Sequence, residues 1–246
     1  MSVIQELLID DYSPEQAEAI QVKYQNLLMQ MSKKKYIRTI KVIDSIVGVD
    51  ISYYKKEQID YGIACAVVWN LNQKKVDSFY FAKDLITFPY KPGFLGFREC
   101  KLLAKVISKI PNKPNLILCD GHGKIHPKRF GEAVHLGFAL NISTIGVAKN
   151  PFIGYFNFQN IKLVKGSKSP IWAQNPRFIT KNSFNELLGY LICLNEGSKP
   201  VFISTGYNIS LNIALKVCLK STIEHRQPEP LHLADKLSRK EINRYI

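Results

Sequence analysis

Three carboxylates stand in segments that otherwise have the composition of a protein core. Asp50 interrupts the strand-like run SIVGVDISYY, and Asp120 follows the apolar run LILC and opens the loop GHG. Glu99 lies three and four residues before Leu102 and Leu103, so a helix would turn it toward the core. An isolated buried carboxylate is costly, and each of these side chains therefore needs a cation, a cluster of donors or a proton.

Converging carboxylates without a thiolate suit a hard cation such as Mg²⁺ or Mn²⁺, which keeps several waters and accepts phosphate oxygens. Such an ion would polarise a scissile phosphate and lower the pKa of an attacking water, whether one ion or two is used. For each carboxylate taken singly, a helix cap, a turn or a salt bridge is the alternative. Taken together, the three predict phosphodiester chemistry.

The histidines offer a rival site. His122, His126 and His135 have spacings that could bind zinc, with Glu132 as a candidate base. However, His126 precedes Pro127 in a loop, whereas His135 falls on the helix predicted for GEAVHLGFAL, so the histidines cannot share one helical face. We therefore favour a place for His126 beside the carboxylate site.

The composition favours an anionic polymer as partner. The chain has 34 Lys and Arg against 20 Asp and Glu, a formal net charge of +14, which suits nucleic acid first and an anionic membrane surface second. A basic protein without such a partner is the alternative. The N-terminal MSVIQELLIDDY lacks the features of a signal peptide, and no apolar run approaches the roughly 18 residues of a membrane span.

These properties predict a cytoplasmic monomer without a membrane segment, with access to the nucleus in a eukaryotic cell. The length suits a single domain over 1–246, with an N-terminal helix and basic stretch in 1–41 and a core over about 42–240. The five cysteines are an odd number without CxxC spacing, and they lie mostly in apolar runs. We interpret them as reduced packing residues.

The N-terminal part begins with helix signals. Ser13, Pro14 and Gln16 form a capping box with proline at the first helical position, which predicts a helix over 13–31. A basic stretch follows, made of Lys33, Lys34, Lys35, Arg38 and Lys41. It could track a phosphate backbone or simply be a solvated surface.

The middle of the chain alternates between strand and helix patterns. Segments 44–54, 60–70 and 74–83 are predicted to be strands of antiparallel hairpins. From residue 96 a helix, the strand LILC, the helix GEAVHLGFAL and a strand over 143–147 follow in turn. This alternation predicts a sheet that is covered by helices.

The C-terminal third carries weaker signals. Residues 164–182 are polar and predicted to be a surface excursion. Ser183 and Glu186 then predict a capped helix through Ile192, followed by the strand VFIS and a last amphipathic helix that starts near Leu211. Antiparallel strands first and parallel strands afterwards, with helices on both faces, give the α/β mixed sheet of ribonuclease-H-like folds.

Four sequence blocks carry a resemblance to a known family. GVDISY, PYKPGFLGFRE, DGHGKIHPKRFGEAVHLG and TIGVAKNPFIG stand in that order between residues 40 and 240 and closely resemble the signature blocks of endonuclease V. The resemblance implies a ribonuclease-H-like, Mg²⁺-dependent enzyme, with Mn²⁺ as a substitute. It implies recognition of inosine in DNA or RNA and hydrolysis of the phosphodiester bond one nucleotide to the 3′ side, leaving 5′-phosphate products. A role in DNA repair and in RNA processing would follow.

The resemblance also assigns roles to the charged residues. Asp50 and Asp120 match the metal-binding aspartates of the family, and Glu99 matches the glutamate that completes the acidic site. Lys149 resembles the lysine near the scissile phosphate, with a plain surface lysine as the alternative. His126 matches a histidine beside the site. Asp235 falls where the family carries an acidic residue or histidine close to the metal, and a helix cap is the alternative there.

The same resemblance predicts how the substrate is held. Tyr90, in PYKP, corresponds to a wedge whose ring fills the space left by a displaced base; a surface tyrosine in a turn is the alternative. A pocket for the displaced base would be lined by Gly93, Leu95, Gly121 and Gly123, because glycine lets backbone groups approach a base edge closely.

Three departures from the family pattern put substrate preference in doubt. DGHG replaces the usual DGQG, HPKR replaces HPRR, and GYNISL replaces GHxISL. His122 thereby adds a titratable donor, and Lys128 is a point charge where a planar guanidinium is usual. The sequence leaves two questions open. One is the choice between DNA and RNA, and the other is whether the chain cuts or binds inosine without catalysis.

Overall fold

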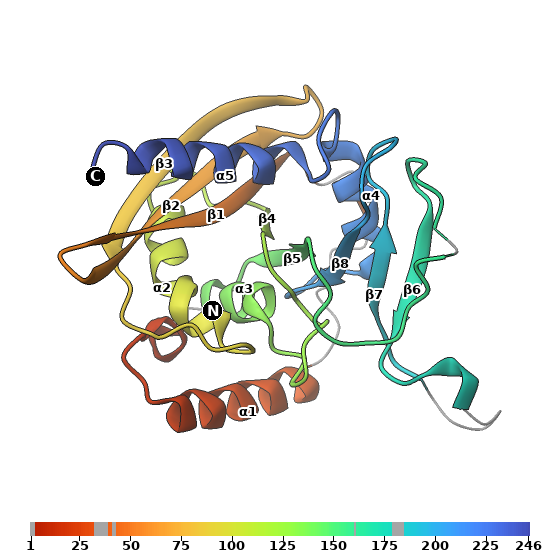
Figure 1. The fold of residues 1–246 in the computed structure, drawn as a ribbon, viewed down its shortest axis with the longest axis horizontal. Coiled ribbons are helices and arrows are strands. Elements are labelled where there is room, and N and C mark those ends of the chain that lie inside the picture. Colours follow the sequence, from red (N-terminus) through yellow and green to blue (C-terminus); the bar gives the residue numbers. More distant parts are fainter. Residues whose placement is uncertain (1–2, 32–38, 41–42, 160, 179–184) are drawn as a thin grey trace.

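A computed structural model describes residues 3–31, 39–40, 43–159, 161–178 and 185–246. Its centre is one eight-stranded sheet in the order β3-β2-β1-β4-β5-β8-β7-β6. Helices cover both faces of the sheet (Figure 1). The predicted α/β architecture, a mixed sheet between helical layers, is confirmed.

The first three strands form an antiparallel meander. They are β1 (Ser45–Lys56), β2 (Ile59–Asn70) and β3 (Lys75–Leu85), close to the predicted ranges. The turn between β1 and β2 consists of Glu57 and Gln58, with φ of 49° and 65°. Two residues with positive φ match the twist of a tight hairpin, so the turn sets the register of the long β1–β2 pair.

The second half of the sheet is only partly parallel. β4 (Leu116–Cys119) and β5 (Ser143–Ala148) run parallel to β1, as predicted. By contrast, β8 (Val201–Thr205), β7 (Leu187–Ile192) and β6 (Lys168–Trp172) are antiparallel to their neighbours. The described residues that connect β6, β7 and β8 include no α-helix, and a parallel pair needs such a long crossover.

The helix predicted from the Ser183 capping box is wrong where the structure describes it, because β7 occupies that segment. Ser183 itself lies outside the described residues. A short apolar run buried on both sides looks the same in a strand and in a helix. Gly189 is the overlooked signal, since an added Cβ would stand 2.2 Å from the Ile203 carbonyl oxygen of β8. The surface excursion over 164–182 is likewise corrected, because β6 lies within it.

The helices form layers on the two faces of the sheet (Figure 1). α2 and α3 pack on one face, and α4 and α5 pack on the other. Short 3-10 turns lie at Gln5–Leu8 and Pro176–Phe178. The α-helices are α1 (Pro14–Gln30), α2 (Leu95–Ile107), α3 (Glu132–Leu140), α4 (Leu211–Ser221) and α5 (Glu229–Ile242).

The two terminal helices differ in how well the sequence predicts them. α1 has the predicted capping box, with Ser13 and Gln16 bonding each other's backbone, and its start is confirmed. The basic stretch after α1 lies outside the described residues apart from 39–40, so phosphate contact there stays a prediction. The sequence did not predict α5, because half of its buried positions are polar, among them Ser238 and Glu241.

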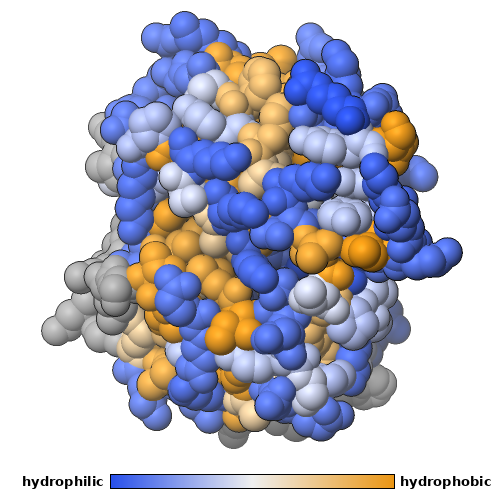
Figure 2. Space-filling model, turned by 90° about the vertical axis from the view of Figure 1, so that its left-hand side faces the viewer, coloured by the Kyte–Doolittle hydropathy of each residue, from blue (hydrophilic) through white to orange (hydrophobic). Residues whose placement is uncertain are grey.

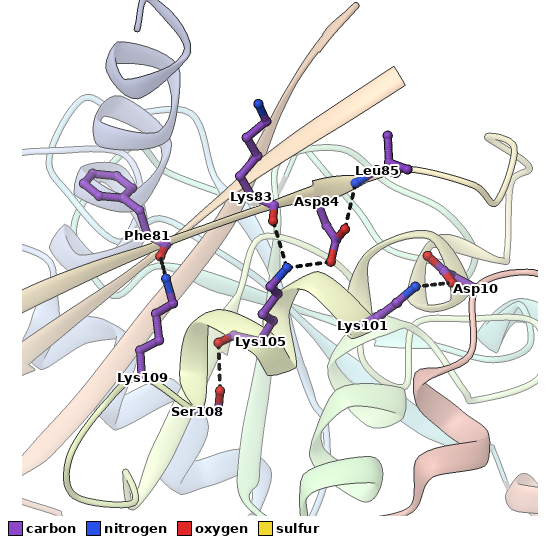
Figure 3. Close-up of polar contacts among 9 residues, drawn as sticks. All are labelled: Asp10, Phe81, Lys83, Asp84, Leu85, Lys101, Lys105, Ser108 and Lys109. Carbon is purple, nitrogen blue, oxygen red and sulfur yellow. Dashed lines mark hydrogen bonds and ion pairs between the residues drawn. The ribbon is translucent and has the colours of Figure 1, made fainter. Parts of the chain in front are cut away.

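One row of lysines joins α2 to the edge strand β3 (Figure 3). Lys101, Lys105 and Lys109 are called the lysine row here; Lys101 and Lys105 share one face of α2, and Lys109 follows two residues after its end. Lys105 Nζ pairs with Asp84 Oδ2 at 2.8 Å, and Lys109 Nζ donates to the Phe81 carbonyl at 2.6 Å. The lysine row thus satisfies part of the backbone at the open edge of the sheet.

The molecular surface next to this edge is mixed in polarity. On the side that carries the β1–β2 turn, polar side chains break up the apolar areas (Figure 2). The five cysteines are free and buried, in agreement with a packing role. No helix in the described part of the chain is long and apolar enough to span a membrane.

Candidate active site

Two of the predicted acids come together where the end of β4 lies beside the middle of β1. β1 and β4 are paired with Val49 opposite Cys119. Asp50 is the next residue of β1, and Asp120 is the first residue after β4. Both side chains are partly exposed. The pairing register therefore places the two carboxylates side by side at the carboxyl end of β4, where open α/β sheets hold their ligands.

The two aspartates open into a cavity of about 340 Å³, called the acidic pocket here. Asp235 of α5 lines the same pocket and accepts a hydrogen bond from Arg239 Nε at 2.5 Å. Lys149, just after β5, completes the charged lining. The lining residues are Asp50, Ile51, Ser52, Tyr53, Asp120, Lys149, Asp235, Arg239 and Ile242.

Negative charge exceeds positive charge around Asp50. Burial raises the pKa of Asp50 to about 8, and the charges of Asp120 and Asp235 add to the rise, while Lys149 opposes it. A cation that entered the pocket would favour the ionised form of Asp50 and lower its pKa. Among the described residues no three His, Cys, Asp or Glu side chains are arranged to hold a metal ion by themselves.

Glu99 joins the acids through Tyr53. It sits on α2 one residue beyond the first turn, slightly later than predicted, and its Oε1 accepts a hydrogen bond from the Tyr53 hydroxyl. The guanidinium of Arg98 lies 4.7 Å from the centre of the Tyr53 ring. Burial raises the pKa of Glu99 to about 7 although the Tyr53 hydrogen bond lowers it.

Glu132, at the start of α3, is a fourth acid. From the sequence, Glu132 was considered only as the candidate base of a zinc site. Its side chain is 4% exposed and shares a hydrogen bond with Glu99. Its Oε2 has no hydrogen-bond partner among the described residues. Burial, followed by the charge of Glu99, raises the pKa of Glu132 well above its usual range. Glu132 therefore holds its proton more firmly than an exposed glutamate, and its hydrogen bond lowers the pKa of Glu99.

Asp120 is held by a donor on each oxygen. Lys149 Nζ pairs with Oδ2 at 2.6 Å, and Gln227 Nε2 donates to Oδ1 at 3.1 Å. Arg226, next to Gln227, donates to the Lys149 carbonyl at 2.7 Å. Glu229 ties this segment down, because its Oε1 accepts from three successive backbone N–H groups. Gln227 was not found from the sequence, because a single glutamine in a loop carries no signal of its own.

A second cavity of about 350 Å³, called the Tyr90 cavity here, adjoins the acidic pocket. The two cavities share Asp120 and Lys149. Four of the predicted substrate contacts line it, namely Tyr90, Gly93, Leu95 and Gly121. The other lining residues are Lys91, Pro92, Asp120, His122, His126, Gly131, Glu132, Ala148, Lys149, Asn150, Pro151 and Phe152.

Gly123 was predicted to line the pocket for the displaced base. Instead it allows the loop after β4 to pack closely against β8. An added Cβ would stand 2.2 Å from the Thr205 carbonyl oxygen, so the backbone of β8 passes directly behind this glycine. Its own N–H donates to Ser204 Oγ at 2.9 Å. Gly123 is needed where two backbones approach closely, which is a different reason from the predicted contact with a base.

The three histidines do not form the rival zinc site. His122 Nε2 contacts the Asn150 carbonyl at 3.1 Å, and His135 Nε2 contacts the Leu7 carbonyl at 2.6 Å. His126 Nε2 lies 3.0 Å from the Gly93 carbonyl, while its Nδ1 accepts from the Lys128 N–H. Each histidine thus faces a different backbone group, and the described residues contain no metal-binding cluster of this kind.

His126 is a neutral residue that holds a loop. Because Nδ1 accepts a hydrogen bond, Nε2 carries the proton and donates to the Gly93 carbonyl. Burial lowers the pKa of His126 to about 4, although the bond to Gly93 opposes this. The structure thus places His126 beside the acids, in the lining of the Tyr90 cavity, as a hydrogen-bond donor to the backbone.

The comparisons with known proteins point to one family. The family model described as Endonuclease V matches residues 25–236. The chain belongs to the endonuclease V family. Endonuclease V of Nostoc punctiforme is 36% identical over 196 residues, which cover 80% of this chain and 82% of that protein. Endonuclease V of Rippkaea orientalis is 33% identical and covers 92% of this chain and 90% of its own length.

Solved endonuclease V structures share the fold over nearly the whole chain. The Bacillus subtilis structure is 27% identical with a TM-score of 0.83, covering 100% of this chain and 98% of that one. Ciona intestinalis endonuclease V was solved with a 24-mer DNA that contains an inosine followed by a ribo-adenosine. It is 28% identical with a TM-score of 0.73, covering 94% of this chain and 100% of that one. As a member of this family, the protein is a nuclease, a hydrolase of phosphodiester bonds.

Proposed function

We infer that this protein is a metal-dependent endonuclease that recognises inosine in nucleic acid and cleaves one nucleotide to its 3′ side. One observation carries the inference: the acidic pocket and the Tyr90 cavity meet at Asp120 and Lys149. A base held in one cavity therefore brings a nearby phosphate into the other. The complex of Ciona endonuclease V with inosine-containing DNA supports inosine as that base.

The donor set fits Mg²⁺ or Mn²⁺. Asp50 and Asp120 supply carboxylate oxygens from β1 and from the end of β4, and burial followed by the charges of neighbouring acids raises the pKa of Asp50. Mg²⁺ commonly binds through one or two carboxylates, several waters and substrate phosphates, so a cage of three protein ligands is not required. When bound, the ion would polarise the scissile phosphate and lower the pKa of the attacking water.

The protein's own residues would orient the substrate and balance its charge. Lys149 places an ammonium group between the two cavities, where it would neutralise charge that builds on the phosphate. Tyr90 is 73% exposed at the rim of its cavity, free to enter the space left by a displaced base. Tyr53 would hold the Glu99 carboxylate toward the acidic pocket.

A paired cleavage assay tests this function. Matched oligonucleotides with a single inosine in DNA or RNA, single or double stranded, are incubated with the protein and Mg²⁺, then Mn²⁺. We expect a product cut one nucleotide 3′ of inosine and a loss of that product on addition of EDTA. Absence of product, or equal product from Asp50→Ala, would overturn the inference. Tight inosine-specific binding without product would indicate a binding protein on the same fold.

A further inference from the structure

The carbonyl of Gly93 accepts two hydrogen bonds from opposite parts of the chain. Gln21 Nε2 of α1 donates to it at 2.7 Å, and His126 Nε2 donates at 3.0 Å. The Gln21 side chain is buried, with the residue only 2% exposed. Gly93 itself has φ of 87°, a conformation that favours glycine. A turn that requires glycine, at the edge of the Tyr90 cavity, is therefore fastened by two buried donors.

Further contacts of α1 reach the same loops. Lys128, which departs from the family pattern, pairs with Glu18 of α1 and lies 5.6 Å from the centre of the Phe94 ring. Glu18 is exposed, so this ion pair contributes little by itself. The apolar face of α1 also shares one core cluster with Phe94 and Phe130, one from each loop that borders the Tyr90 cavity.

From these contacts we propose that α1 is a positioning element for inosine recognition and that Gln21 is its key positioning residue. Gln21 fixes Gly93, and Gly93 sets the path of the loop that presents Tyr90 three residues earlier. This inference rests on the proposed function. Gln21 precedes residues 25–236, which the family model matches, so that match does not itself account for this contact.

The physical reason lies in the exposure of Tyr90. A ring that enters a duplex needs a stiff loop behind it. A flexible loop would lose conformational entropy when the ring inserts, and this loss would weaken binding. The Tyr90 side chain has little packing of its own at 73% exposure.

The stiffness must therefore come from the rest of the loop. Phe88 and Phe94 are buried on either side of this tyrosine in the sequence. The Gly93 carbonyl adds a backbone anchor that Gln21 and His126 provide together.

The test measures binding, with Ca²⁺ in place of Mg²⁺, to a duplex with one inosine and to the same duplex with adenosine. Gln21→Met keeps the length of the side chain and removes its donor. We expect affinity for the inosine duplex to fall roughly fivefold, the range for one lost hydrogen bond, while affinity for the adenosine duplex stays unchanged. Gln30→Leu, on the exposed end of α1, serves as the matched control.

Two more variants separate positioning from general destabilisation. In a Tyr90→Ala background, Gln21→Met should have no further effect, because both act through the same loop. Gln21→Asn keeps the amide but withdraws it from Gly93, so it should show the same pattern if Gln21→Met folds poorly. Thermal unfolding of every variant is recorded alongside.

The outcomes distinguish the two proposals. Equal losses on both duplexes, or no loss on the inosine duplex, would overturn the role of Gln21 while leaving the proposed function intact. Additive losses in the Tyr90→Ala background would also overturn it. A wild-type protein that does not prefer the inosine duplex would overturn both the proposed function and the role of Gln21.

Discussion

The acidic pocket and the lysine row handle charge in opposite ways. In the lysine row, Lys101 pairs with Asp10 at 2.8 Å and Lys105 pairs with Asp84 at 2.8 Å, at a partly exposed edge of the sheet (Figure 3). In the acidic pocket, Lys149 pairs with Asp120 and Arg239 pairs with Asp235, whereas Asp50 has no ion pair among the described residues.

The pKa values express this difference. Burial is the largest single influence on Asp84 and would raise its pKa. The hydrogen bonds from Lys105 and from the Leu85 N–H, with the charges of Lys105 and Lys101, together outweigh it, and the pKa is lowered. Burial raises the pKa of Asp50 to about 8, and the neighbouring acids add to the rise. A charge cluster that the protein neutralises is structural, whereas one left with a surplus is suited to a ligand of opposite charge.

The largest effect is expected from Asp50→Asn. Cleavage of inosine DNA should fall by at least about 10²-fold, because even residues behind a metal ligand commonly cost 10–100-fold when lost. Without metal the variant should be more stable at pH 7, since the folded pKa of about 8 exceeds the ordinary value of 3.8 and ionisation opposes folding between them. Single-turnover cleavage measures the first effect, and urea unfolding in EDTA measures the second. Cleavage within tenfold of wild type would contradict the role of Asp50 as a metal ligand.

The next effect is expected from Lys149→Met. Removing the ammonium group should lower kcat by roughly 10²-fold with a smaller change in KM, as for other groups that balance transition-state charge. Lys105→Met is the matched control, because it removes the same charge from the lysine row. Steady-state kinetics on one inosine oligonucleotide compare the two. Equal losses in both variants would show that Lys149 acts only through net charge.

Gln227→Leu should weaken metal binding. The amide of Gln227 orients Asp120 from the side opposite Lys149, and loss of such a contact commonly costs 10–100-fold, so we expect roughly 10-fold weaker Mn²⁺ binding. Electron paramagnetic resonance of free Mn²⁺, without nucleic acid, measures this directly. Unchanged Mn²⁺ affinity would mean that Lys149 alone positions Asp120.

Glu132→Gln should stabilise the protein, and more so at high pH. The folded pKa of Glu132 is raised, so the unfolded chain ionises above its ordinary value of 4.5 while the folded chain keeps the proton, and stability falls as pH rises. The neutral amide removes that dependence, so the gain in the free energy of unfolding should be larger at pH 8 than at pH 5. Urea unfolding at pH 5 and pH 8 measures the change in stability. An equal change at the two pH values would show that the ionisation of Glu132 is not its cause.

The smallest effect is expected in the lysine row. Lys105→Met should change the free energy of unfolding by less than about 1 kcal/mol, because Lys105 and Asp84 are partly exposed and water screens their attraction. Cleavage should stay within twofold of wild type. Thermal unfolding and the oligonucleotide assay check both. A large loss of cleavage would remove the contrast between the two charge clusters.

The sequence by itself predicted the β1–β2–β3 meander, the strands β4 and β5, the start of α1 and the residues Asp50 and Asp120. Each of these depends on local pattern: an apolar run, a capping box, or one charge in an otherwise apolar segment. Such patterns indicate that a segment is buried and which of its residues depart from the apolar pattern. They do not say which segments are neighbours.

Tertiary structure decided the rest. Only the β1–β4 register sets Asp50 beside Asp120, and only the folded chain brings Gln227 to Asp120, 107 residues away in sequence. β7 became a strand because β8 runs behind Gly189, which no local periodicity reveals. Surplus charge in the acidic pocket is likewise a property of the assembled site, because it depends on what surrounds each carboxylate once distant segments have packed.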